Sequence, residues 1–185
     1  MSQGGQEVEI KLPATDAESA RRLLYRAGFR VYKRRVFEDN TVFDTPTHTL
    51  SRAAQLLRLR EAGGKAILTY KGTPVAAKHK SREEQEVEVS DPAKIRIIVE
   101  RLGFKPAFRY QKYRTEFKRP RESGVATLDE TPIGVYLELE GQPAWIDRTA
   151  RRLGYREADY IISSYGRLFG EWRKRNQAKQ TDMTW

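Results

Sequence analysis

Short segments of this chain alternate charged with apolar residues, and the sign of the charge differs from segment to segment. Residues 7–11 read EVEIK and residues 137–140 read LELE, whereas residues 57–60 read LRLR. In a β-strand alternate side chains lie on the same face, so each of these segments would carry one charged face and one apolar face. This pattern constrains the fold more than any other feature, because each charged face must meet water or opposite charges.

Further segments with alternating or β-branched patterns predict additional strands, and other segments predict helices. The predicted strands are residues 7–11, 36–43, 56–60, 66–70, 82–89, 111–117, 125–129 and 135–140. The predicted helices are residues 16–27, 92–102, 144–153 and 158–175. We expect residues 1–175 to form a single domain, and residues 176–185 to fray as a C-terminal tail.

A strand, a helix, a glycine and an aromatic residue follow one another three times, which suggests an internal duplication within one domain. Thr15 and Glu18 predict a capping box at the start of the first helix. Asp91 before Pro92 predicts the N-terminus of the second. A glycine directly after a helix favours the left-handed conformation of a C-terminal cap. The glycines in this position are Gly28, Gly103 and Gly154.

Two architectures account for the alternation. An antiparallel sheet with its apolar face on the core and its charges in water explains any single strand. Alternatively, eight strands can close into a barrel whose charged faces line a lumen and whose apolar outside is covered by helices. Carboxylates in such a lumen would bind Mg²⁺ or Mn²⁺, and lysine and arginine side chains would bind phosphate. The alternation alone leaves both architectures open.

Composition narrows the classes of partner. The chain has 35 basic and 25 acidic residues, a net charge of +10. This excess suggests an anionic partner such as nucleic acid, a nucleotide, polyphosphate or a membrane surface. The absence of cysteine excludes disulfides, thiolate zinc sites, iron–sulfur clusters and cysteine nucleophiles. Neither a membrane-spanning segment nor a signal peptide is expected, and cytoplasmic localisation is the simplest expectation.

The order of these motifs resembles the CYTH family, also called triphosphate tunnel metalloenzymes. Residues 7–11 resemble its ExExK signature, and residues 57–60 its LRxR strand. Residues 68–72 (LTYKG) and 81–89 (SREEQEVEV) are similar to its next two strands. Second-half matches follow at residues 112–114, 128–129 and 137–140, so the resemblance runs from Glu7 to Phe169. Residues 164–169 (SYGRLF) are most similar to the class IV adenylate cyclase branch, whereas residues 38–50 match that branch only in part.

The resemblance implies an α+β fold: an eight-stranded antiparallel closed β-barrel, the triphosphate tunnel, with helices packed outside. It implies Mg²⁺ or Mn²⁺ as cofactor, with metal ligands Glu7, Glu9, Asp129, Glu138 and Glu140. The implied phosphate-binding residues are Lys11, Arg58, Arg60, Lys71, Arg82, Lys112 and Arg114. The implied catalytic residues are Lys11, Arg58, Arg60, Arg82 and Glu84.

The implied activity is the conversion of ATP to cyclic AMP and pyrophosphate. The alternative is hydrolysis by an inorganic tripolyphosphatase or an organic triphosphatase, such as a thiamine triphosphatase. A third hypothesis is a non-catalytic module that binds polyphosphate or RNA. The expected partner is a nucleoside triphosphate or tripolyphosphate, with no membrane or nucleic-acid partner, and a homodimer is plausible by analogy. His48 and His79 have no companion residues and are expected to be solvent-exposed or in turns.

Overall fold

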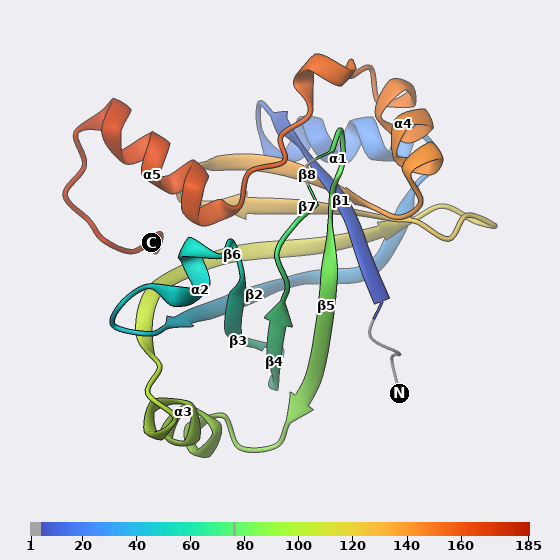
Figure 1. The fold of residues 1–185 in the computed structure, drawn as a ribbon. Helices are drawn as coiled ribbons and strands as arrows, with labels where there is room; N and C mark the ends of the chain where they lie inside the picture. Colours follow the sequence, from blue (N-terminus) through green and yellow to red (C-terminus); the bar gives the residue numbers. More distant parts are fainter. Residues whose placement is uncertain (1–4, 76) are drawn as a thin grey trace.

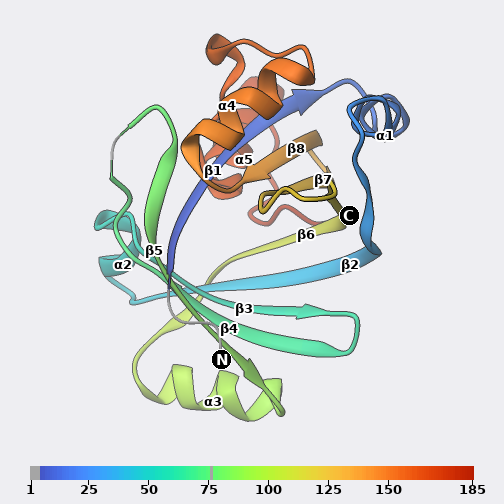
Figure 2. The same cartoon turned by 90° about the vertical axis from the view of Figure 1, so that its right-hand side faces the viewer.

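Eight antiparallel strands close into a barrel in the computed structural model, which describes residues 5–75 and 77–185. The ring order is β1-β5-β4-β3-β2-β6-β7-β8, and β1 closes it by pairing with both β5 and β8. The strands are β1 (Gly5–Ala14), β2 (Arg30–Asp44), β3 (Leu56–Ala62), β4 (Lys65–Lys71), β5 (Lys80–Val89), β6 (Lys105–Lys118), β7 (Val125–Thr131) and β8 (Gly134–Glu140). Figures 1 and 2 show this ring from two sides, and the predicted fold class is confirmed.

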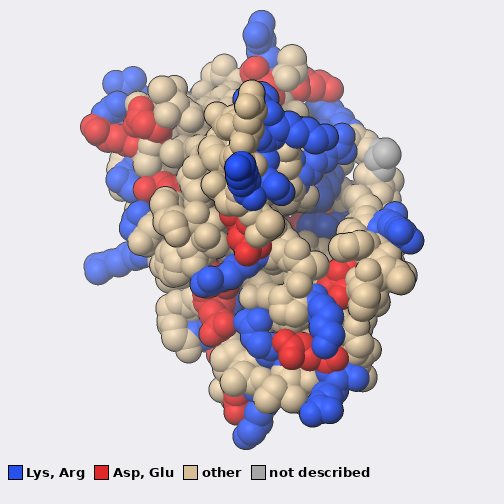
Figure 3. Space-filling model, turned by 90° about the vertical axis from the view of Figure 1, so that its left-hand side faces the viewer, with Lys and Arg blue, Asp and Glu red and all other residues tan. Residues whose placement is uncertain are grey.

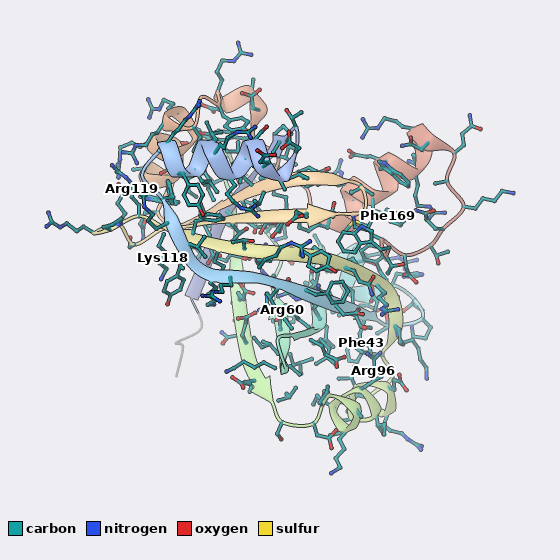
Figure 4. All side chains as sticks on the ribbon, turned by 180° about the vertical axis from the view of Figure 1, so that it is seen from behind. Phe43, Arg60, Arg96, Lys118, Arg119 and Phe169 are labelled. Atoms are coloured by element: carbon teal, nitrogen blue, oxygen red, sulfur yellow. The ribbon has the colours of Figure 1, made fainter. Side chains whose placement is uncertain are left out.

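Strands β2 and β6 are the longest, and each begins six residues before the position at which the sequence predicted it to start. Their pairing shifts register between Val31 and Lys33, and again between Lys33 and Val36. A β-bulge adds an unpaired residue and so breaks the alternation of side chains between the two faces. The alternating pattern therefore indicates only the regular part of β2. Figure 4 shows β2 and β6 running side by side across a face whose middle no helix covers.

Helices lie outside the ring. They are α1 (Ala17–Arg26), the short α2 (Thr49–Arg52), α3 (Pro92–Arg101), α4 (Pro143–Arg152) and α5 (Tyr165–Asn176). The left-handed glycines after three of them are confirmed, with φ of 88° at Gly28, 94° at Gly103 and 85° at Gly154. Asp91 caps α3 as predicted, since its carboxylate accepts from the backbone N–H of Lys94 at 2.9 Å.

The predicted capping box at the start of α1 is wrong. The cap is Asp16, whose carboxylate accepts hydrogen bonds from both the backbone N–H and the hydroxyl of Ser19, at 2.7 and 2.8 Å. Aspartate is among the strongest N-cap residues, and here it stands one position after the predicted Thr15. The helix consequently starts at Ala17, one residue later than the sequence predicted.

The last helix starts at Tyr165, not at residue 158 as the sequence predicted. Before it the chain makes one short 3₁₀ turn (Glu157–Asp159) and then runs extended, because Ile161 exchanges two backbone hydrogen bonds with Lys11 of β1, at 2.8 and 2.9 Å. The tail that was expected to fray lies against β6. Met183 is fully buried and bonds through its backbone to Arg109 and Gln111.

The apolar faces of the strands point outward into cores beneath the helices, so the charged faces point inward. Beneath α1 and α4 the strand residues Ile10, Leu128 and Leu139 are completely buried. A smaller core joins Leu59 of β3 to Val99 of α3. This arrangement settles the choice that the alternation left open in favour of the closed barrel. No helix among the described residues is long and apolar enough to cross a membrane.

One close approach in the larger core is directly testable. An ideal Cβ atom on Gly124 would lie 2.4 Å from the indole of Trp145, which is held by a hydrogen bond to Glu122 and by the ring of Phe29. Because this rigid indole must shift, we expect Gly124→Ala to destabilise the fold by about 1–3 kcal/mol in urea unfolding. Gly170→Ala in α5, where nothing lies within 4 Å, is the control and should be neutral or stabilising. Equal stability of Gly124→Ala and the wild type would contradict this packing.

Candidate functional site

The site residues predicted from the sequence lie on the inner wall of the barrel. They come from seven of the eight strands, and ion pairs link all of them except Glu140 into two networks, a small one around Lys71 and a larger one that includes Asp129. The predicted residues are Glu7, Glu9, Lys11, Arg58, Arg60, Lys71, Arg82, Glu84, Lys112, Arg114, Asp129, Glu138 and Glu140. The eighth strand, β2, contributes residues that the motifs did not include. The structure therefore brings the predicted residues together, and their individual roles remain predictions.

On the side formed by β1, β4 and β5, lysine and arginine side chains hold the glutamates of the ExExK segment. Lys71 Nζ lies 2.6 Å from Glu7 and 2.9 Å from Glu84. Arg82 Nε lies 3.4 Å from the second oxygen of Glu7. The side chains of Glu7, Lys71 and Arg82 are all less than a tenth exposed. Such pairs are stable only where the charges also form hydrogen bonds, and Lys71 donates to both oxygens of Glu7.

On the side formed by β6, β7 and β8, Asp129 is the centre of the larger network. It is completely buried and accepts hydrogen bonds from Lys112 at 2.7 Å, from Arg114 at 2.6 and 2.7 Å, and from the hydroxyl of Tyr165 at 2.8 Å. The Arg114 guanidinium is held bidentately and also pairs with Glu138. One carboxylate thus fixes two cations of the wall and the first residue of α5.

The electrostatics keep these buried groups charged. Burial opposes ionisation of Glu9, but Lys11 and Lys80 hold the pKa of that carboxyl well below its usual range. Burial likewise opposes ionisation of Glu138, and Lys11 and Arg114 lower its pKa well below the usual value. The pKa of Lys11 is raised in turn, because Glu138 and Glu9 outweigh the effect of its burial. Lys11 is therefore positively charged, and Glu9 and Glu138 are negatively charged, at neutral pH.

Glu140 differs from the other wall carboxylates, because no ion pair among the described residues includes it. The residue is exposed to solvent at the end of β8. Partial desolvation, together with the nearby charges of Glu7 and Glu9, raises its pKa to about 7. Glu9 lies directly opposite Glu140 in the pairing of β1 with β8. Carboxylates that repel one another in this way are stabilised by a divalent cation such as Mg²⁺ or Mn²⁺, so the donor chemistry fits the implied metal.

The lysines and arginines that hold the carboxylates also keep them apart. Among the residues that the structure describes, no three acidic or histidine side chains already converge to hold a metal ion. A groove of about 620 Å³ lies elsewhere, between the β3–β4 hairpin and the start of α3, and none of the predicted site residues lines it. The face that carries α2 and α5 shows lysine and arginine side chains gathered beside a hollow (Figure 3).

A protein-family model for the CYTH domain matches residues 5–165. The chain belongs to the CYTH family. A protein of Methanocaldococcus jannaschii named as a putative adenylate cyclase is 33% identical over 135 residues, which are 72% of this chain and 75% of that protein. The family that the sequence motifs predicted is thereby confirmed.

Solved structures agree with the CYTH fold. A putative adenylate cyclase from Vibrio parahaemolyticus superposes with a TM-score of 0.78 at 21% identity, covering 91% of this chain and 99% of the other. A protein from Pyrococcus horikoshii gives a TM-score of 0.74 at 28% identity, over 89% and 98% of the two chains. A putative adenylyl cyclase from Hippeastrum, described as having a dominant triphosphatase activity, gives 0.63 at 18% identity, over 92% and 95%.

The CYTH motifs did not include several buried residues of the wall. Lys80 Nζ lies 2.7 Å from Glu9, although the sequence predicted the strand to begin only at Arg82. Extending the alternation of β5 backward by two residues would have found it. Glu38 on β2 faces Lys112 and Arg60, at 3.7 and 3.8 Å. Asn40 and Tyr110 also lie outside the motifs, whereas Thr69, Tyr165 and the exposed Glu86 lie within motifs but were given no role in the site.

His79, which the sequence predicted to be solvent-exposed or in a turn, is buried. It is only 8% exposed, because the segment before β5 folds against α4 and its Nε2 atom lies 2.8 Å from Asp147. Asp147 also pairs with Lys78 at 3.2 Å and accepts from the hydroxyl of Tyr160 at 3.1 Å. Such a partner lies 68 residues away in the sequence and leaves no local signal. His48 is exposed in a turn, as expected.

The dependence of the wall on Asp129 is testable. Asp129→Ala would leave Lys112 and Arg114 buried without their main partner, which should destabilise the fold by about 3–5 kcal/mol. The measurement is urea unfolding at pH 7.5. Glu130→Ala is the control on the same strand, since it removes only a partly exposed ion pair with Arg35 and should cost about 1 kcal/mol or less. Equal losses in the two variants would contradict the central place of Asp129.

Proposed function

We propose that this CYTH protein is a metal-dependent enzyme that acts on the triphosphate of a nucleotide, converting ATP to cyclic AMP and pyrophosphate. The observation that carries the proposal is a closed wall on which buried lysine and arginine side chains alternate with carboxylates. Phosphate oxygens suit the cations and a divalent metal suits the carboxylates. The adenylate cyclase names of the relatives support the choice of ATP as substrate.

In this proposal the carboxylates of the wall bind the metal, and its lysine and arginine side chains bind the triphosphate. Glu7, Glu9, Asp129, Glu138 and Glu140 would hold Mg²⁺ or Mn²⁺. The triphosphate would bind Lys11, Arg58, Arg60, Lys71, Arg82, Lys112 and Arg114, with Glu84 completing the wall. When bound, the metal would polarise phosphate oxygens and neutralise part of their charge. Lys80 is added to the phosphate-binding set because it is buried beside Glu9.

The chain's own residues would contribute positioning and charge neutralisation. Arginine binds two phosphate oxygens at once and so fixes the orientation of the chain of phosphates. Orientation places the ribose 3′-hydroxyl in line with the α-phosphorus, and the cations stabilise the charge that develops on the departing pyrophosphate. The buried wall also excludes bulk water, which would otherwise compete with the hydroxyl as nucleophile.

Hydrolysis is the second candidate function. The same cations would hold a triphosphate while water attacks a terminal phosphorus, so the wall fits a tripolyphosphatase or an organic triphosphatase equally well. The triphosphatase activity described for the Hippeastrum structure supports this alternative. A module that only binds polyphosphate or RNA is the third candidate. The carboxylates beside the cations count against it, because acids weaken the binding of an anion.

A product assay tests the proposal. The purified chain would receive ATP or tripolyphosphate, each with Mg²⁺ and separately with Mn²⁺, and the products would be resolved by phosphorus NMR and chromatography. Cyclic AMP with pyrophosphate is the expected result. Orthophosphate without cyclic AMP would replace the cyclase by a triphosphatase. Binding of tripolyphosphate without any product would move the protein to the binding class.

A carboxylate variant separates metal binding from phosphate binding. Glu9→Ala removes a predicted metal ligand and frees Lys80, while Lys11 keeps its pair with Glu138 at 3.2 Å. Turnover should therefore fall about 100-fold or more. The Kd for tripolyphosphate in EDTA should stay within about threefold of the wild-type value or become tighter. Glu88→Ala is the control, because Glu88 pairs with Lys65 on the surface and lies outside both networks. Full turnover in Glu9→Ala would reject Glu9 as a metal ligand.

A further inference from the structure

Strand β2 carries two buried hydrogen-bond acceptors that are unsatisfied. Among the described residues, neither Asn40 Oδ1 nor Glu38 Oε2 has a hydrogen-bond partner. Asn40 is completely buried and Glu38 is 4% exposed. The two residues are two positions apart on a regular stretch of β2, so they share a face, and the ion pairs of Glu38 with Lys112 and Arg60 identify that face as the lumen. Buried polar groups without a partner are rare in folded proteins and require an explanation.

The surroundings of Asn40 Oδ1 and Glu38 Oε2 make both oxygens hydrogen-bond acceptors. The Asn40 amide nitrogen donates to the backbone carbonyl of Tyr110 at 3.4 Å, which leaves the amide oxygen free. Burial opposes ionisation of Glu38, but Lys112 and Arg114 lower its pKa to about 2. The Glu38 side chain is therefore a carboxylate at neutral pH and can only accept hydrogen bonds.

A triphosphate cannot satisfy these acceptors. Ionised phosphate oxygens accept hydrogen bonds but donate none, so they would satisfy the unpartnered Nε atom of Arg58 in the same wall. Phosphate oxygens would leave Asn40 Oδ1 and Glu38 Oε2 without a hydrogen-bond donor. Lys112 Nζ lies 3.7 Å from Glu38 Oε2, too far for a hydrogen bond. A hydroxyl or an amine hydrogen would satisfy both acceptors, and inorganic tripolyphosphate brings neither.

The place of β2 in the ring fits this requirement. Four steps around the barrel separate β2 from β1 in either direction, so the two strands face each other across the lumen. Of the proposed metal ligands, Glu7 and Glu9 lie on β1 opposite the acceptor pair, Glu138 and Glu140 lie on the adjacent β8, and Asp129 lies on β7, two steps from β2. Arg60 lies beside β2 in this lumen (Figure 4) and pairs with Glu38. A ligand held by its triphosphate among the cations can therefore present its remaining part to β2.

We propose that Asn40 and Glu38 form an acceptor pair that binds a hydrogen-bond donor on the nucleoside part of the substrate. The site would thus select a nucleoside triphosphate over an inorganic polyphosphate. This inference rests on the proposed function, because it assumes that the triphosphate binds in the lumen. The donor is either a ribose hydroxyl or the exocyclic amine of the base, since both present hydrogens of the same kind.

Calorimetric titration in EDTA tests the pair without turnover. The ligands are ATP, its 2′-deoxy and 3′-deoxy forms, inosine triphosphate and tripolyphosphate. The variants are Asn40→Leu, which keeps the shape without the amide, and Glu38→Gln, which keeps the shape without the charge. Thr115→Val is the matched control, because Thr115 is also buried with an unpartnered hydroxyl but lies on the opposite face of β6 from Lys112 and Arg114.

We expect Asn40→Leu to weaken ATP binding about tenfold, the usual effect of one lost hydrogen bond, while the Kd for tripolyphosphate changes less than twofold. Unchanged tripolyphosphate binding also shows that the lumen of the variant is intact. The ligand that lacks the recognised donor should bind the wild type about tenfold more weakly than ATP does, and should bind Asn40→Leu as well as ATP does. A loss with the deoxy forms identifies a ribose hydroxyl, and a loss with inosine triphosphate identifies the amine.

Other outcomes overturn the inference. If Asn40→Leu and Glu38→Gln weaken ATP and tripolyphosphate equally, or weaken neither, the pair does not read the nucleoside. A tenfold loss of ATP binding in Thr115→Val would show that any buried hydroxyl or amide has this effect. If the wild type binds neither ATP nor tripolyphosphate in EDTA, this inference fails, and the proposed function fails with it only if the product assay with Mg²⁺ or Mn²⁺ also shows no product. If the wild type binds both and only the selectivity is missing, the proposed function stands and this inference alone fails.

Discussion

Buried charge must be neutralised inside the barrel wall, and the rest of the structure depends on this constraint. Transferring an ion from water to a protein interior costs several kcal/mol even after relaxation, so each buried ion needs a partner and hydrogen bonds. The strands meet this need by bringing carboxylates and cations from neighbouring strands to the same inner face. Asp129, with two cations and a tyrosine hydroxyl around it, is the clearest case. The apolar faces are then left for the outside, where the helices cover them.

The same constraint determines how the lumen can respond to a ligand. In the free protein the cations neutralise the carboxylates, so the wall has nearly balanced charge and its side chains reach across to one another. A triphosphate offers the cations new partners, and a divalent metal offers new partners to the carboxylates that they release. Either ligand alone would leave one sign of charge uncompensated. On the proposed function, the wall would therefore favour joint binding of the anion and the metal, and Glu140, which has no ion pair among the described residues, would be the carboxylate closest to that state.

Local periodicity explains what could be predicted from the sequence. Where the strands are regular, alternation places a charge such as Arg58 or Glu138 on the inner face, and the motifs named the wall residues of seven strands. The failures have non-local causes. Bulges break the alternation in β2, the pairing of Ile161 with Lys11 delays the last helix, and the contact of His79 with Asp147 joins distant segments. Asn40 was missed because an amide directly after two acidic residues looks like an ordinary surface residue until its burial is known.

The pairing of β1 with both β5 and β8 has a consequence for the synthesis of the chain. The first strand of the barrel, β1, can take its final place only after the last strand of the barrel, β8, has been made, more than a hundred residues later. Contacts between such distant residues slow folding, because a long loop must close before they form. The glutamates of β1 and β8 can meet only when these two strands pair, so the proposed metal ligands on them come together late, when the barrel closes.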